Sequence, residues 1–456
     1  MYALAAPLWV VGVPALIAVV LVTRWWQPLA VLVWLGVVVV RDSGAPPVPG
    51  RLLRPDEEPE LASLVRTCAE RCGFDALLTV RVLPVPDAVL ARTRIGGRAG
   101  YVLGLGWPFI RILPAAQLAA VVAHELAHSE IENVRRAEWL VGGRNALAMS
   151  LDNMVHVPRR LARRLLEATT PTAWSIELAA DTAGARAVGG LAACEAIEAT
   201  SWCSNAFDMA AHLWLEAMLE AGEYPVDFYA ALDEALRDPY VRRRLESELA
   251  FDELLHGPDE SHPTTALRVA AMAAGAASSP FGVEPVLIRS REALDAWCIE
   301  QLLPFKDGTP RPMKVREADL DAYRTQDRPT RELLSAATLA VLNDASWAAG
   351  LDALRDERHW RALAEIVEPE IEHVPPSVRP AAQRLGMVGC LTSLLTDVLM
   401  QAGWARATRW VATVRVAPDG SVVDVMELAE RAVDSGDSAP LTALLDSASP
   451  GWADRS

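Results

Sequence analysis

The sequence predicts a mainly α-helical α+β protein in three parts: an N-terminal membrane anchor, a helical domain with a small sheet, and an appended helical C-terminal domain. Three observations support this fold class. A long uncharged stretch opens the chain, apolar residues recur at helical spacing through most of the remaining residues, and only a few short segments alternate as strands do. With 456 residues, the chain is long enough for two or three domains.

The membrane anchor is predicted over residues 1–42. Residues 3–23 carry no charge over 21 positions, which as a helix measures ~31 Å and matches the hydrocarbon core of a bilayer. Residues 28–40 form a second, shorter apolar run behind a break that contains two tryptophans. We favour a transmembrane helical hairpin over a single span.

A hairpin would leave both of its ends on the same side of the membrane. Arg41, Arg51 and Arg54 follow the second apolar run, and positively charged flanks favour the cytoplasmic side. The basic residues are almost all arginine and alanine is abundant, a composition typical of a GC-rich bacterial genome. The expected location is therefore the inner or plasma membrane of a bacterium, with the rest of the chain in the cytoplasm.

The overall composition argues against one class of function. The net charge is −16 and the isoelectric point is near 5.1, whereas proteins that bind nucleic acid take much of their affinity from a basic face. Nucleic acid is therefore not an expected partner. The hydrophobic content of 52% and the mean hydropathy of +0.17 agree with a membrane segment and a lipid bilayer as partner.

The six cysteines are sparse and form no C-x-x-C pair. They are Cys68, Cys72, Cys194, Cys203, Cys298 and Cys390. We interpret them as free thiols that pack as small hydrophobic side chains in a reducing compartment; disulfides or a second metal site are the alternatives.

The second domain is predicted over residues 43–280. The expected strands cover residues 78–85 and 101–105, and the expected helices cover residues 58–72, 114–132, 170–188, 191–200, 206–221, 227–254 and 264–277. Thr170 followed by Pro171 predicts the start of one helix, because proline is favoured in a first helical turn.

The third domain is predicted over residues 281–456. Its expected helices cover residues 294–303, 332–360 and 380–404. The last of these is apolar enough to raise a third membrane span, but Asp397 favours a core helix. Residues 410–426 predict a β-hairpin around a Pro-Asp-Gly turn, and residues 434–456 predict a loose polar tail.

The helix expected over residues 114–132 carries the motif H-E-x-x-H. Its members are His124, Glu125 and His128. Residues four apart lie on one helix face, so His124 and His128 can direct two imidazoles at one metal ion, with Glu125 beside it as a base. The pattern is typical of a zinc metalloprotease if a third ligand is present elsewhere.

The third ligand is predicted on the next helix. Glu177 and Asp181 are four residues apart, so both can face the H-E-x-x-H helix. We expect Glu177 to complete the site of one Zn²⁺ per chain, and Asp181 to accept the second ring N–H of a ligand histidine. Glu125 would take a proton from the metal-activated water and pass it to the leaving amine.

The pairing of H-E-L-A-H with E-L-A-A-D resembles the HtpX-like and CAAX prenyl endopeptidase family of membrane-anchored zinc metallopeptidases, of the gluzincin type. Shorter matches are Glu58-Pro59-Glu60-Leu61, residues 117–122, and the segment from Ser261-His262-Pro263 to Arg268. The resemblance covers roughly residues 1–275. It implies a zincin-like protease fold for the second domain.

The same resemblance implies roles for further residues. His262 would help to stabilise the tetrahedral oxyanion, and Arg268 would order the site. The family's Asn-Ala-aromatic-Ala strand, which lies beside bound substrate, corresponds to residues 86–90. Here Asp87 replaces the asparagine and Val89 the aromatic residue, so the resemblance does not define the substrate preference.

The leading hypothesis is a membrane-anchored zinc endopeptidase that acts on polypeptides, with membrane proteins among the candidate substrates, in membrane-protein quality control or processing. The rival hypothesis is a membrane-tethered interaction or scaffold protein with a vestigial protease fold, because the long C-terminal domain carries no catalytic motif. A third reading is an exopeptidase of the same metal class.

Overall fold

The computed structural model of the chain describes residues 49–129, 140, 143–144, 147, 159–255, 262–272, 279–303, 310–321, 328–369, 371 and 378–448. These residues divide into two compact units. The first unit takes in the described residues up to Thr200 and those between His256 and Arg291. The second contains Ser201–Leu255 and the described residues from Glu292 onward.

The predicted fold class needs one correction. The described residues are mainly helical with small sheets, as expected, but none of their helices combines the length and the apolar character that crossing a bilayer requires. Helix α5 is apolar but has 13 residues, or ~20 Å, and α7 is long but begins with arginines. The transmembrane hairpin is therefore not supported as part of the fold class; its predicted location, residues 1–42, lies outside the described residues.

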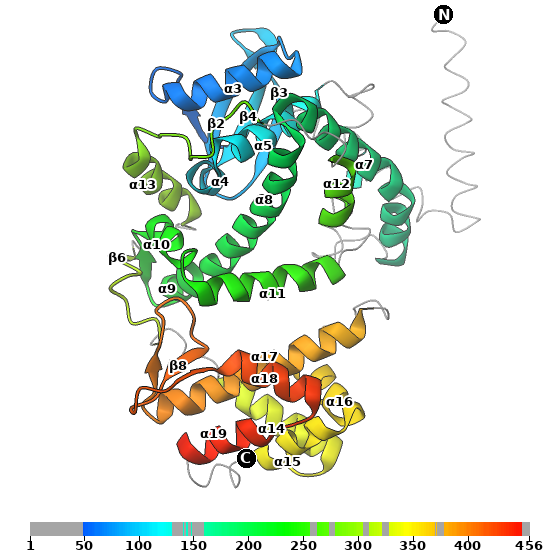
Figure 1. Cartoon of the computed structure of the whole chain (residues 1–456), viewed down its shortest axis with the longest axis vertical. Helices are drawn as coiled ribbons and strands as arrows, with labels where there is room; N and C mark the ends of the chain where they lie inside the picture. Colours follow the sequence, from blue (N-terminus) through cyan, green and yellow to red (C-terminus); the bar gives the residue numbers. More distant parts are fainter. Residues whose placement is uncertain are drawn as a thin grey trace, which may run out of the picture. The chain divides into compact units, whose positions relative to one another are not determined.

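The first unit combines helices with a four-stranded sheet (Figure 1). Its strands are β1 (Arg51–Leu53), β2 (Leu77–Leu83), β3 (Ala88–Ile95) and β4 (Arg98–Gly106). Its helices are α3 (Pro59–Cys72), α4 (Trp107–Ile112), α5 (Ala115–Ala127), α7 (Arg159–Val188), the first half of α8 (Gly190–Ala210), and α12 (Thr265–Met272). The strand order is β1-β2-β4-β3, with β2 and β4 parallel, so β3 is an outer strand.

Strand β3 was not among the strands expected from sequence periodicity. It forms an antiparallel hairpin with β4, in which Ile95 pairs with Arg98 across Gly96 and Gly97. Both glycines have positive φ, 57° and 83°, and tight two-residue hairpin turns of this kind need that conformation at both positions. The Gly-Gly pair was the sequence signal for this hairpin.

Helix α5 is buried nearly all round, among the sheet, α3 and α7. Its first backbone N–H groups lack a side-chain cap, because Pro114 precedes the helix. The N–H of Ala115 instead donates to the carbonyl of Glu284 at 2.9 Å, and that of Ala116 donates to the carbonyl of Gly282 at 2.9 Å. The segment after α12 thus satisfies donors that would otherwise be left unpaired in an apolar interior.

Helix α3 packs against α5 through two of the cysteines. The thiol of Cys68 lies 3.6 Å from the carbonyl of Ala119, and that of Cys72 lies 4.0 Å from the carbonyl of Ala123. All six cysteines are free, as predicted.

Helix α7 begins eleven residues before the predicted start at Thr170, and Pro171 lies inside it. Proline removes the backbone donor that would bond to the carbonyl of Glu167 four residues earlier. The hydroxyl of Thr170 donates to the carbonyl of Leu166 at 2.8 Å, and Arg144 donates to the same carbonyl at 2.8 Å. These side-chain hydrogen bonds reinforce the turn just before the proline, and α7 continues through it.

The second unit is helical with two small sheets among its described residues. Its elements are the π-helical segment Ala211–Glu216, α9 (Ala217–Glu220), β5 (Glu223–Pro225), α10 (Phe228–Ala235), α11 (Pro239–Leu255), α13 (Arg291–Leu302), β6 (Arg311–Met313), α14 (Arg328–Leu342), α15 (Trp347–Asp352), α16 (Glu357–Val367), α17 (Arg379–Gln401), β7 (Ala405–Arg406), β8 (Val414–Val416), β9 (Val422–Asp424), α18 (Val425–Ser435) and α19 (Ala439–Ala448).

Five sequence predictions from residue 191 onward were wrong, four in the bounds of a helix and one in the character of the tail. The helices expected at 191–200 and 206–221 are one continuous helical rod, which passes through the π-helical segment. The helix expected at 227–254 breaks before Pro239, where the Asp238 carboxylate accepts the N–H of Tyr240 at 2.8 Å and starts a new helix. The helix expected at 332–360 breaks at Asn343, whose φ is 58°. The tail expected to be loose contains α19.

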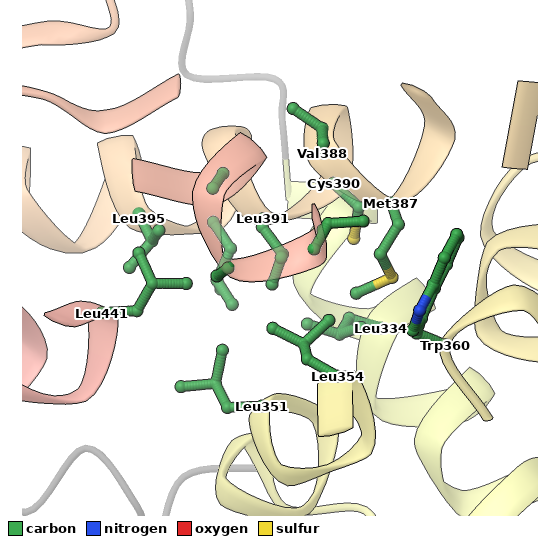
Figure 2. Packing of buried hydrophobic residues seen from close by; sticks show 14 of the residues in the cluster. Leu334, Leu351, Leu354, Trp360, Met387, Val388, Cys390, Leu391, Leu395 and Leu441 are labelled. Carbon is green, nitrogen blue, oxygen red and sulfur yellow. The ribbon is translucent and has the colours of Figure 1, made fainter. Parts of the chain in front are cut away.

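Helix α17 is the centre of the second unit's hydrophobic core. It presents Leu391 and Leu395 toward Leu351, Leu354 and Leu441 of the surrounding helices (Figure 2). This helix is the apolar segment containing Asp397, and the prediction that it is a core helix is confirmed. The predicted β-hairpin is also confirmed, as β8 and β9, with β7 added beside β8.

In this unit the carboxylate of Asp321 forms ion pairs with two arginines. Arg415 is fully buried and donates to Asp321 at 2.9 Å and 3.0 Å, and Arg406 donates to the same carboxylate at 2.6 Å. Burial alone would raise the pKa of Asp321, but the two guanidinium groups lower it below its usual value. Asp321 therefore joins the segment 310–321 to the sheet of β7, β8 and β9 through a charged contact.

Substituting Asp321→Asn is expected to destabilise the second unit by about 3–5 kcal/mol, because Arg415 would be left as a buried charge without its counter-ion. Urea unfolding of the full chain, followed by tryptophan fluorescence, measures the loss. The folded pKa of Asp321 is lowered, so its stabilisation is present above the unfolded value of about 3.9 and disappears as the pH falls through the folded value. The two proteins should converge in stability in that acidic range.

The matched control is Asp352→Asn, which removes a carboxylate from an exposed pair with Arg355. An exposed pair contributes less than about 1 kcal/mol. Equal losses in the two variants would contradict the assignment of a buried ion pair.

Candidate metal centre

The two histidines of the motif meet at the C-terminal end of α5. The Nε2 atoms of His124 and His128 lie 3.2 Å apart, and the two rings are nearly perpendicular, with an interplanar angle of 88°. This convergence follows from the four-residue spacing on a helix. Two ring nitrogens this close together can bind the same cation.

Glu177 of α7 completes the group. Its Oε2 lies 3.4 Å from Nε2 of His124, and its Oε1 lies 3.7 Å from Nε2 of His128. One ligand atom from each of the three residues lies within 4.8 Å of the others. The prediction that His124, His128 and Glu177 can hold a metal ion is thereby confirmed.

The chemistry of these donors fits the predicted ion. Two imidazole nitrogens with one carboxylate oxygen is a donor set of catalytic zinc sites, in which three protein ligands leave one position open. The identity of the ion remains a prediction from this donor set.

Asp181 supports the group from behind, one turn after Glu177. Its Oδ1 lies 2.9 Å from Nδ1 of His124, on the side of the ring away from Glu177. Arg268 of α12 donates to both oxygens of Asp181, each at 2.8 Å. The chain from Arg268 through Asp181 to His124 orients the imidazole, which is the role expected of a carboxylate behind a metal ligand.

The two helices approach closely at Gly184. A Cβ at this position would lie 3.2 Å from the backbone nitrogen of His124 and 3.4 Å from its Cα. Gly184 is seven residues after Glu177 and three after Asp181, so it lies on the same face of α7. The absence of a side chain lets α7 bring both carboxylates within reach of the histidines. Gly184 was not predicted as part of the site, although its spacing from Glu177 and Asp181 in the sequence places it on their face of the helix.

Burial and charge act in opposite directions on the ligands. Burial alone would lower the pKa of His124, but the carboxylates of Asp181 and Glu177 raise it to about 10. Burial lowers the pKa of His128 to about 4, with help from the charge of His124. Burial would raise the pKa of Glu177, but His124 and His262 hold it well below its usual range. In the metal-free protein, His124 is therefore protonated at neutral pH and carries the positive charge of the group.

Glu125 lies beside this group with a different environment. Burial raises its pKa to about 7, and the charges of Glu177 and Asp87 act in the same direction while His124 opposes them. The backbone N–H of Leu90 on β3 donates to its carboxylate. Glu125 is therefore poised to exchange a proton near neutral pH. The link between β3 and Glu125 depends on strand register and was not visible in the sequence.

His262 reaches the same group from the segment before α12. Its Nδ1 lies 2.7 Å from Oε2 of Glu177, and its ring centroid lies 6.4 Å from that of His124. About half of its side chain remains exposed to solvent. The structure thus brings together all seven residues that sequence analysis had assigned to the site: His124, Glu125, His128, Glu177, Asp181, His262 and Arg268.

No protein-family model matches this chain, and neither a curated protein nor a solved structure is significantly similar to it. The resemblance to the HtpX-like family therefore rests on the paired H-E-L-A-H and E-L-A-A-D motifs and the shorter matches beside them.

Substituting Gly184→Val is expected to weaken metal binding at least about tenfold, because the added methyl groups would push α7 away from His124 and carry Glu177 and Asp181 with it. Metal content after dialysis and competition with a chelator measure the change.

Gly389→Val provides the matched control, since Gly389 lies in helix α17 with open space around it. That variant should retain wild-type metal affinity. Equal metal affinity in Gly184→Val and the wild type would show that the close helix contact does not position the ligands.

Metal affinity is expected to rise with pH, by up to about tenfold per pH unit below pH 10, because the ion must displace the proton held on His124. The sign follows from a raised histidine pKa: the proton competes more strongly as the pH falls. His128 is already neutral above about pH 4 and releases none. Calorimetric titration in buffers of different ionisation enthalpy counts the released protons, and about one is expected at neutral pH; a value near zero would refute the charge assignment.

Proposed function

We propose that this chain is a zinc-dependent endopeptidase that hydrolyses peptide bonds with the help of activated water. The observation that carries the proposal is the convergence of His124, His128 and Glu177 on one point, with Glu125 next to it. The similarity of the paired motifs to the HtpX-like family supports the same reading. The location in a bacterial cell membrane and the role in membrane-protein processing stay predictions from the sequence.

His124, His128 and Glu177 would hold the ion, and Asp181 with Arg268 would keep His124 in the correct orientation. When bound, zinc supplies Lewis acidity, which polarises a carbonyl and lowers the pKa of water. Glu125 takes a proton from the attacking water and then gives it to the leaving amine. In the metal-free protein, burial raises the pKa of Glu125, which is the direction that a general base needs.

Strand β3 offers a place for an extended substrate. It is an outer strand of its sheet, it packs against α5, and Leu90 on it donates its N–H to Glu125. An extended peptide can add to a strand edge through backbone hydrogen bonds, and here its carbonyl would take the place of Glu125 at the outward N–H of Leu90. A peptide bond held there would lie close to Glu125. Half-exposed His262 would donate to the oxyanion that forms on the carbonyl oxygen.

The proposal predicts that Glu125→Gln keeps about one zinc ion per chain but lowers the rate of peptide hydrolysis by roughly 10²–10⁴-fold, the usual contribution of a general base. Elemental analysis of the purified protein counts the metal, and mass spectrometry of a digested unfolded protein detects cleavage. Glu70→Gln, at an exposed position of α3, is the matched control and should cleave normally.

Unchanged cleavage by Glu125→Gln would exclude the mechanism. Wild-type protein that purifies without metal and does not regain it from added zinc would instead favour the rival hypothesis, an interaction protein with a vestigial protease fold.

A further inference from the structure

Asp87 is held in place at the entrance of β3. Its backbone carbonyl accepts the N–H of Gly106 at 2.7 Å, and its own N–H donates to the carbonyl of Val85 at 2.9 Å. Its Oδ1 accepts the N–H of Ala88 at 2.8 Å. The residue is exposed, so this network fixes the carboxylate at the surface instead of burying it.

The backbone pattern of β3 directs a paired peptide past this residue. In an antiparallel pair, backbone groups of successive residues point alternately to the neighbouring strand and away from it. The carbonyl of Asp87 bonds to Gly106 at the end of β4, whereas the N–H of Leu90 points outward to Glu125. A peptide that adds to the outer edge of β3 near Glu125 would therefore pass beside Asp87.

Within the described residues, the positive charge that acts on Asp87 is that of a histidine, His262. The Oδ2 atom of Asp87 accepts no hydrogen bond from the part of the chain that the structure describes, and no arginine or lysine forms an ion pair with it there. Although Asp87 is exposed to solvent, neighbouring protein atoms partly desolvate its carboxylate and raise its pKa, and the charge of His262 acts against this rise. The charge of Asp87 in turn contributes to the raised pKa of Glu125. Asp87 therefore interacts electrostatically with two residues of the metal group, His262 and Glu125.

The opposite end of β3 has the opposite charge. Arg94 is exposed seven residues after Asp87, which along a strand is a distance of ~23 Å, and exposed Arg98 follows the turn. A cationic substrate group is therefore favoured at the Asp87 end of the strand edge and disfavoured at the turn end.

We propose that Asp87 is a specificity-determining residue that selects substrates carrying a cationic group, an ammonium or a guanidinium, beside the scissile bond. The inference rests on the proposed endopeptidase function and adds its substrate class. A carboxylate attracts such a group through a charge-assisted hydrogen bond and repels an acidic residue at the same position. The cation is either a lysine or arginine side chain or the free α-amino group of a short peptide.

The test compares kcat/KM of the zinc-loaded full chain for peptides that differ only in one residue beside the scissile bond: lysine, glutamine or glutamate, each with an acetylated N-terminus. Wild type is expected to prefer lysine over glutamine about fivefold, the effect of one partly exposed ion pair. Asp87→Asn keeps an acceptor for the N–H of Ala88 and should abolish this preference. Asp87→Lys should reverse it in favour of glutamate.

Asp75→Asn is the matched control, because Asp75 is exposed just before β2, at the other end of the sheet. It should keep the wild-type preference for lysine. Zinc content equal to that of the wild type shows that each variant retains its metal site. Peptides with a free α-amino group beside the scissile bond distinguish the two sources of the cation: a gain over the acetylated form that requires Asp87 assigns the α-amine.

The two levels of the proposal fail differently. Cleavage by Asp87→Asn with an unchanged lysine-to-glutamine ratio overturns the role of Asp87 and leaves the endopeptidase intact. Wild-type protein that cleaves no peptide of the set or unfolded protein, and so behaves like Glu125→Gln, overturns the endopeptidase and the inference together.

Discussion

The close contact between α5 and α7 is the constraint on which the site depends. A helix crossing normally separates two backbones by the side chains between them, and Gly184 removes that spacer at the level of His124. The carboxylates that precede Gly184 on the same face then reach the histidines of the other helix directly. The metal group thus depends on the contact at Gly184, because Glu177 and Asp181 reach the imidazoles only if the two helices approach this closely.

Around that contact, negative groups outnumber positive ones. Glu177, Asp181 and Glu125 surround His124, and Arg268 balances only one of them. In the metal-free protein the imbalance is met by a proton on His124 and by a neutral fraction of Glu125. A divalent cation would neutralise more of this excess negative charge than one proton does. Its binding would release the proton from His124.

The site was more predictable than the fold around it, for a physical reason. The ligands lie on helices at four-residue spacing, and such local geometry is contained in the sequence itself. The hydrogen bond from Leu90 to Glu125 was not predictable, because it depends on how a strand and a helix distant in sequence pack together.

The errors in helix boundaries have the same origin. Pro171 was a valid local signal for a helix start, yet α7 continues through it, and Arg144 and Thr170 reinforce the turn just before it through hydrogen bonds to Leu166. In the tail, Leu441, Leu444 and Leu445 are spaced for a helix and are buried in the second unit, but their small, polar neighbours concealed the pattern. The predicted transmembrane hairpin rested on composition alone, and no helix in the described ranges has the properties of a membrane span.

The division of the chain has a consequence for the order in which the protein is made. The first unit is interrupted: the chain leaves it after Thr200 and returns to it only beyond Leu255. Arg268 lies 91 residues after Glu177, so a ribosome adding about 5–20 residues per second completes the three metal ligands some 5–18 s before it supplies Arg268. During that interval the nascent chain holds the three ligands and Asp181 without Arg268, and the site matures only once the intervening part of the second unit has been synthesised.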